Sequence, residues 1–167
     1  MIKKKICLVG AFAVGKTSLV RQYVHSIFSE KYLTTVGVKI DKKPVRADDR
    51  DIDLIIWDLH GEDDFQSVRM SYLRGAAGCF FVADGTRIET LETAMTLQKR
   101  VRDAIGPVPS ILAINKRDLS AQWEANLPEM DRIAASGIPI FETSAKTGQS
   151  VEDAFQALAA MTLEATV

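Results

Sequence analysis

The chain has 167 residues, of which 47% are hydrophobic and 26% are charged, so it can bury one ordinary core and is unlike a disordered segment. Its 21 basic and 22 acidic residues give a formal charge of −1, which excludes the basic surface typical of proteins that bind nucleic acid or anionic membranes. No run reaches the ~18 apolar residues of a membrane helix, and the start lacks a secretory signal. We expect one cytoplasmic, monomeric domain over residues 1–167.

Apolar bursts alternate with helical patterns along the whole chain. This alternation predicts an α/β fold, with a mostly parallel sheet and helices on both faces. Ligands of such sheets gather beyond the carboxyl ends of the strands. A polar turn at 48–50 joins the second and third strands into an antiparallel hairpin. The expected strands are 2–9, 36–46, 52–58, 78–84, 108–115 and 138–143, and the expected helices are 16–25, 88–105, 122–136 and one that begins near 151.

Residues 10–17 read Gly-Ala-Phe-Ala-Val-Gly-Lys-Thr and match the G-x-x-x-x-G-K-[ST] frame of a loop that cradles phosphates. The loop opens the first helix, where main-chain amides and the helix dipole favour an anion. Lys16 would bridge the β- and γ-phosphates, and Thr17 would bind Mg²⁺. A glycine turn without a ligand is the alternative. The expected nucleotide-binding residues of this loop are Ala13, Val14, Gly15, Lys16, Thr17 and Ser18.

A second motif, Asn115-Lys116-Arg117-Asp118, ends the fifth expected strand. The Asp118 carboxylate can accept both the ring N–H and the exocyclic amine of guanine, a bidentate fit that adenine does not offer. Taken alone, the tetrapeptide could equally be a polar turn with Asp118 as a helix cap. Its place behind a phosphate loop favours the nucleotide role. The expected base-side residues are Asn115, Lys116 and Asp118, followed by Ser144, Ala145 and Lys146.

Three further residues can complete the phosphate and metal site. Asp58 follows a strand and can hold Mg²⁺ through water, as the equivalent carboxylate does in phosphate-loop enzymes. The amide of Gly61 can meet the γ-phosphate, and the Thr35 hydroxyl can join the metal shell. The predicted metal ligands are therefore Thr17, Thr35 and Asp58.

In their order, these motifs resemble the Ras superfamily of small GTPases, and the segments 35–38 and 56–58 are similar to its Rab branch. The resemblance covers nearly the whole chain. It implies a six-stranded sheet with one antiparallel strand and five helices, and a switch that binds GTP or GDP with Mg²⁺. It also implies two segments, roughly 29–38 and 59–73, that order around the γ-phosphate. Phe28 would pack against guanine; the alternative is an ordinary apolar contact at a helix end.

Two positions depart from that family. The family usually has glycine in place of Phe12 and a water-orienting glutamine in place of Glu62. Ionised Glu62 can accept a hydrogen bond but not donate one. The Phe12 benzyl group would obstruct that glutamine, a partner's arginine finger, or both, and such an arginine contributes about 10³- to 10⁵-fold in rate. With Lys16, Gly61 and Glu62 as the catalytic set, we expect slow hydrolysis; the counter-hypothesis makes Glu62 or His60 an unconventional water-positioning group.

The function classes that remain differ in turnover. The first is a switch that signals through effector proteins, with exchange factors and activating proteins as regulators. The second is a nucleotide-bound interaction module with negligible hydrolysis, and the third is an ATP-using enzyme such as a kinase, which the motif at 115–118 argues against.

The printed chain ends Leu163-Glu164-Ala165-Thr166-Val167 without the cysteines of prenylated relatives, so we expect no direct membrane anchor. A prokaryotic relative fits these departures.

Overall fold

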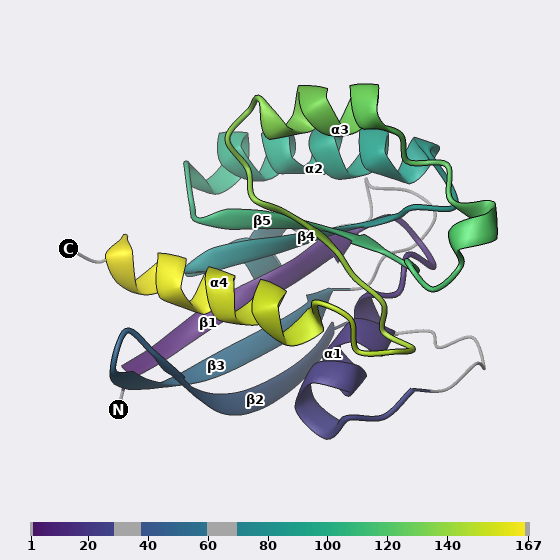
Figure 1. Cartoon of the computed structure of the whole chain (residues 1–167). Coiled ribbons are helices and arrows are strands. Elements are labelled where there is room, and N and C mark those ends of the chain that lie inside the picture. The colour runs from purple at the N-terminus through teal and green to yellow at the C-terminus, as the bar shows by residue number, and fades with distance from the viewer. Residues whose placement is uncertain (1, 29–37, 60–69, 166–167) are drawn as a thin grey trace.

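The computed structural model describes residues 2–28, 38–59 and 70–165, and it is built on one sheet of six strands (Figure 1). The strand order is β2-β3-β1-β4-β5-β6. Only β2 runs antiparallel, against β3; the other neighbours are parallel, which confirms the predicted sheet. The strands are β1 (Ile2–Gly10), β2 (Val38–Ala47), β3 (Arg50–Leu59), β4 (Gly78–Asp84), β5 (Ser110–Asn115) and β6 (Ile140–Glu142).

The β2–β3 hairpin turns at the predicted polar segment. Asp48 and Asp49 both have positive φ angles, of 48° and 61°. Aspartate tolerates this region, and a two-residue turn with positive φ at both positions matches the twist of its strands. The turn fixes the register, with Ala47 opposite Arg50 and Val38 opposite Leu59.

Helices cover both faces of the sheet. In Figure 1, α2 and α3 lie over one face, and α1 and α4 lie over the other. The described residues hold four α-helices, so the expectation of five is wrong for this part of the chain; residues 70–73 at the end of the second expected switch segment form only a short 3₁₀ helix, η2. The helices are α1 (Lys16–His25), α2 (Glu89–Ile105), α3 (Leu127–Ala134) and α4 (Val151–Glu164). None of these described helices is long and apolar enough to cross a membrane.

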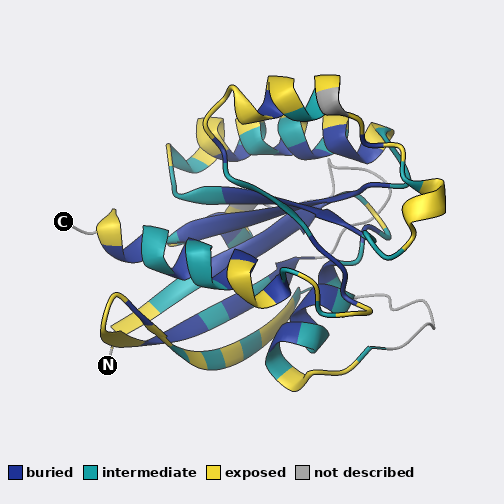
Figure 2. Ribbon diagram, viewed as in Figure 1, coloured by how far each residue is buried: buried dark blue, intermediate teal, exposed yellow. Residues whose placement is uncertain are grey.

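The central strands are buried on both faces, which explains their unbroken apolar sequences. Side chains alternate along each strand, so Phe80 packs with α4 residues on one face while Phe81 packs with α2 residues on the other. Figure 2 shows the contrast between these buried strands and β2, which alternates between exposed and half-buried positions at the sheet edge. Two cores, one on each face, therefore hold the sheet between its helices.

Proline and asparagine set element ends that the apolar pattern missed. Strands β5 and β6 begin later than predicted, because Pro109 and Pro139 lack the N–H that would extend the ladder; each still accepts a bond through its carbonyl, from Cys79 and Leu112. The helix predicted over 122–136 begins only at Leu127, since the Asn126 side chain caps it.

The parallel strands β1, β3, β4, β5 and β6 end at one edge of the sheet. The segments that follow β1, β4, β5 and β6 in the described chain start at residues 11, 85, 116 and 143. These are the segments that carry the phosphate and base motifs, so the fold brings them together where ligands of such sheets bind.

Candidate functional site

The phosphate loop has the tight backbone that its sequence predicts. Gly15 lies at φ 104°, a conformation that favours glycine. An added Cβ there would come within 2.3 Å of Asn115 Nδ2, so both conformation and space require glycine. Ala13 also has a positive φ, of 61°. Helix α1 begins directly after this turn, at Lys16.

Lys16 is buried and folds back over the loop. Its Nζ donates to the carbonyls of Gly10 and Ala11, at 3.1 and 2.9 Å. Burial lowers the pKa of Lys16 to about 8; the carboxylate of Asp58 opposes this shift, and the Arg87 guanidinium adds to it. A cation held in so little water is well placed to bind a polyanion, whose charge would restore its proton affinity.

The predicted metal side contains a close pair of oxygen groups. The Thr17 hydroxyl donates to Asp58 Oδ2 at 2.6 Å, and Asp58 is only 1% exposed. Hydroxyl and carboxylate oxygens are the ligands that Mg²⁺ takes beside substrate phosphates, so these residues fit that ion. The described residues contain no cluster of three histidine, cysteine, aspartate or glutamate side chains that could hold a metal.

Asn115 joins the base motif to the phosphate loop. Its Nδ2 donates to the Val14 carbonyl at 3.0 Å. Its Oδ1 accepts from the Thr143 hydroxyl at 3.1 Å and from the Ala145 amide at 3.3 Å. One buried amide side chain therefore ties together three segments that are distant in sequence.

Lys116 and Asp118 are held from two sides. Lys116 Nζ donates to the Ala13 carbonyl at 3.0 Å and pairs with Asp84 at 2.8 Å. Asp118 Oδ1 accepts from the Ser144 hydroxyl at 2.7 Å, and that hydroxyl in turn accepts from the Thr147 amide. Asp118 is thus fixed beside the segment predicted to flank the base.

The structure leaves the roles of several predicted site residues untested. Phe28 is half-buried and packs against the core beside α1 and α4, so a base contact stays a prediction. Thr35, Gly61 and Glu62 lie outside the described residues, as does His60, and their roles also stay predictions.

Sequence reasoning missed Asp84 and Arg87. Burial alone would raise the pKa of Asp84, but bonds from Lys116, Thr86 and Arg87 outweigh it and hold that pKa below its usual value. Arg87 bonds Asp84 through Nε at 3.0 Å and the Phe12 carbonyl through Nη2 at 2.9 Å. The available signal was a polar Asp-x-Thr-Arg run directly after a buried strand that ends at the ligand edge.

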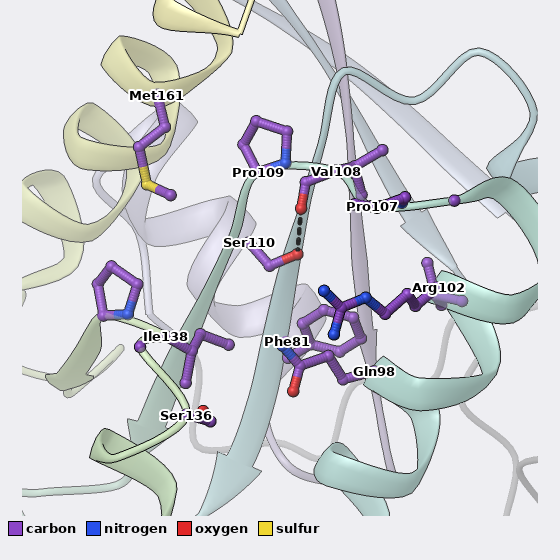
Figure 3. Close-up of a pocket in the computed structure, with 14 residues that line it drawn as sticks. Phe81, Gln98, Arg102, Pro107, Val108, Pro109, Ser110, Ser136, Ile138 and Met161 are labelled. Atoms are coloured by element: carbon purple, nitrogen blue, oxygen red, sulfur yellow. Dashed lines mark hydrogen bonds between the residues drawn. The ribbon is translucent and has the colours of Figure 1, made fainter.

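A separate pocket, of about 240 Å³, lies near the amino end of β5 and is drawn in Figure 3. Arg102 and Gln98 of α2 line it together with Phe81 and three prolines. Because β5 is parallel to β4 and β1, this pocket is at the edge of the sheet opposite the phosphate loop.

Comparisons with known proteins agree with the site. The family model described as Ras family matches residues 5–164. The chain is 36% identical to human Ras-related protein Rab-7b over 163 residues, which cover 95% of this chain and 82% of the relative. It is 37% identical to Ras-related protein Rab7 of Glycine max over 164 residues (93% and 80%), and 32% identical to Ras-related protein Rab-13 of Bos taurus over 157 residues (93% and 77%). The chain belongs to the Ras family, as a Rab-like small GTPase.

Proposed function

We propose that this chain is a guanine-nucleotide switch that binds GTP or GDP with Mg²⁺, hydrolyses GTP slowly and signals through effector proteins. The proposal is supported above all by hydrogen bonds that side chains donate to the main-chain carbonyls of the phosphate loop. Those of Phe12, Ala13 and Val14 each accept a side-chain bond from the β4 and β5 ends. Because C=O and N–H point in opposite directions across a trans peptide, the amides of the same peptides would be turned away from these donors and toward a bound phosphate.

Guanine selectivity would come from Asp118. Its carboxylate is held by Ser144 at the same edge of the sheet as the phosphate loop. A carboxylate accepts two parallel N–H bonds from guanine, whereas adenine presents no such pair. Asn115 would keep the base side and the phosphate side at a fixed separation, since it bonds both.

Thr17 and Asp58 would hold Mg²⁺, with Thr35 completing the protein's share of its ligands. The ion supplies positive charge against the phosphate oxygens when bound. Lys16 would hold the β- and γ-phosphates from the other side, and its buried position makes its charge more effective than it would be in water.

Slow hydrolysis follows from Phe12 and Glu62. Phe12 lies at the loop tip and remains 37% exposed, so its ring would be free to obstruct a water-orienting side chain or an activating partner's arginine. At the position of the family's glutamine, ionised Glu62 would add negative charge where negative charge develops during hydrolysis. The same exposed ring favours the second candidate, a nucleotide-bound interaction module with negligible turnover.

The test is single-turnover hydrolysis of GTP on the purified chain with Mg²⁺, after the retained nucleotide is identified by chromatography. We expect a guanine nucleotide and a slow rate, which rises in Phe12→Gly combined with Glu62→Gln. Phe12→Leu is the matched control, because it keeps the bulk and should stay slow. A fast rate in the unmodified chain without a partner would overturn slow hydrolysis, and an adenine nucleotide would overturn the switch. No hydrolysis together with identical GDP- and GTP-analogue states would favour the interaction module.

A further inference from the structure

Side-chain donors hold every carbonyl from Gly10 to Val14. Lys16 holds the first two, and Lys116 and Asn115 hold the last two. All three donors belong to the motifs already described. The carbonyl between them, of Phe12, is held by Arg87 at 2.9 Å from 75 residues away. Arg87 therefore completes a set whose other members are the residues proposed to bind the nucleotide.

The Arg87 guanidinium bonds two partners at once, and one of them is the phosphate loop. Its Nε bonds the buried carboxylate of Asp84 at 3.0 Å, while Nη2 bonds the Phe12 carbonyl. Asp84 also pairs with Lys116 at 2.8 Å, so one carboxylate orients the two cations that hold neighbouring loop carbonyls. A planar guanidinium can make both contacts at once, whereas an ammonium acts as a point charge.

The segment that carries Arg87 is itself rigid. The Trp123 ring lies where a Cβ on Gly85 would be, and the amides of Glu124 and Ala125 both donate to the Gly85 carbonyl. The Ile88 amide, directly before α2, donates to the Glu124 side chain at 3.1 Å. Contacts on both sides thus fix the backbone from which Arg87 extends.

The contact lies at the γ-phosphate end of the loop. In such loops the lysine reaches the β- and γ-phosphates, and here Lys16 touches the carbonyls of Gly10 and Ala11, directly before that of Phe12. Arg87 is also close enough to Lys16 to lower its pKa. The Arg87 guanidinium therefore adds positive charge near the Lys16 ammonium.

We propose that Arg87 is a positioning residue that acts through the Phe12 carbonyl to hold the loop tip for the terminal phosphate, and so favours the triphosphate over the diphosphate. The proposal rests on the proposed nucleotide binding. A GDP complex makes fewer contacts with the tip, so the loss of Arg87 affects it less. No activating partner is needed for this preference, because the arginine is part of the chain.

The experiment measures dissociation constants of a non-hydrolysable GTP analogue and of GDP by calorimetry with Mg²⁺, for wild type, Arg87→Ala and Arg87→Lys. We expect Arg87→Ala to weaken the analogue about tenfold more than GDP, the loss of one charge-assisted contact. Arg87→Lys keeps the charge without the fork and should fall between. Arg102→Ala, which removes an arginine of α2 at the distant pocket (Figure 3), should equal wild type.

Three outcomes overturn the proposal. They are a wild-type affinity for both nucleotides in Arg87→Ala, an equal loss of affinity for both nucleotides in Arg87→Ala, and an Arg87→Lys variant with no loss at all. Thermal unfolding of each nucleotide-free variant shows whether it folds; if Arg87→Ala does not, the Arg87→Lys comparison decides alone. A wild type that binds neither nucleotide contradicts the proposed function itself, whereas a wild type that binds both and variants that match it contradict only the role of Arg87.

Discussion

Asn115 donates a 3.0 Å hydrogen bond to the carbonyl of Val14, 101 residues earlier in the chain. The bond joins the end of β5 to the phosphate loop, and the same side chain accepts from Thr143 and Ala145. The base motif and the phosphate motif are thus parts of one hydrogen-bonded unit. The loss of Asn115 should therefore affect folding as well as binding.

Asn115→Ala should lower the free energy of unfolding of the nucleotide-free protein by about 3 kcal/mol, because it leaves buried polar groups without partners. It should also weaken guanine nucleotides. Urea unfolding measures the first effect and calorimetry the second. Asn126→Ala is the matched control: Asn126 makes one exposed cap contact, so its loss should cost about 1 kcal/mol and leave binding unchanged. Equal effects of the two variants would contradict the linking role of Asn115.

Thr17→Ala should abolish the tightening of nucleotide binding by Mg²⁺ while leaving the affinity in excess chelator nearly unchanged. The reason is that the hydroxyl lies 2.6 Å from the Asp58 carboxylate, where both oxygens suit that ion. Thr17→Ser retains the hydroxyl and should retain the metal effect. Thr93→Ala, which removes an exposed hydroxyl on α2, is the control. If Thr17→Ala weakens nucleotide binding equally with and without Mg²⁺, Thr17 supports the structure of the loop and does not bind the ion.

Nucleotide affinity should fall as the pH rises above about 8. Burial lowers the pKa of Lys16 to about 8 in the nucleotide-free protein, so Lys16 loses its proton from that pH upward, whereas the phosphate-bound form retains it. Each pH unit above this point then costs up to about tenfold in affinity. Calorimetry at pH 8.5 in buffers of different ionisation enthalpy should show proton uptake, and Arg87→Ala should move the fall to higher pH. A flat profile between pH 7 and 10 would contradict the assignment.

The same pKa gives a stability prediction of the opposite sign. Because the folded pKa of Lys16 lies below the value of 10.5 for an exposed lysine, the unfolded chain binds more protons between pH 8 and 10.5, and unfolding becomes less favourable as the pH rises through that window. Relative to Lys16→Met, the nucleotide-free wild type should therefore gain stability over this range. Urea titrations of both proteins at several pH values measure the difference, and a constant difference would contradict it.

Gly85→Ala should destabilise the protein by about 2 kcal/mol, the range of overpacked sites. The added Cβ would lie 2.1 Å from the Trp123 ring, and the ring is held by Arg117, whose guanidinium stacks on it at 4.7 Å. Replacing Trp123 with leucine in the Gly85→Ala background should recover part of the loss in thermal unfolding. If the Trp123 substitution recovers none of the lost stability, the clash between the added Cβ at position 85 and the Trp123 ring is not the cause.

Hydrophobic patterns within single segments were sufficient to predict most of the strands and helices. The run 78–83 is apolar and, with Asp84, forms β4 over the predicted residues, because a strand buried on both faces needs no polar side. The helix predicted over 122–136 was too long, since one side chain, Asn126, caps the chain at a later point. Its apolar spacing carried no information about where it begins.

Contacts between strand ends could be predicted only where a motif marked both partners. The spacing of Lys16, Asn115 and Asp118 placed each after a strand, and the sheet brings those ends together. Arg87 has no such marker: its contact with Phe12 depends on the β1–β4 register and on the rotamer that Asp84 imposes. Such a relationship appears only once the strands are placed side by side.

The most direct measurement is calorimetric titration of the nucleotide-free chain with GDP and with ADP, each with Mg²⁺. We expect tight binding of GDP and binding of ADP weaker by at least about a thousandfold, because a carboxylate such as Asp118 recognises guanine through two hydrogen bonds that adenine lacks. Equal affinities, or no heat with either compound, would contradict this expectation.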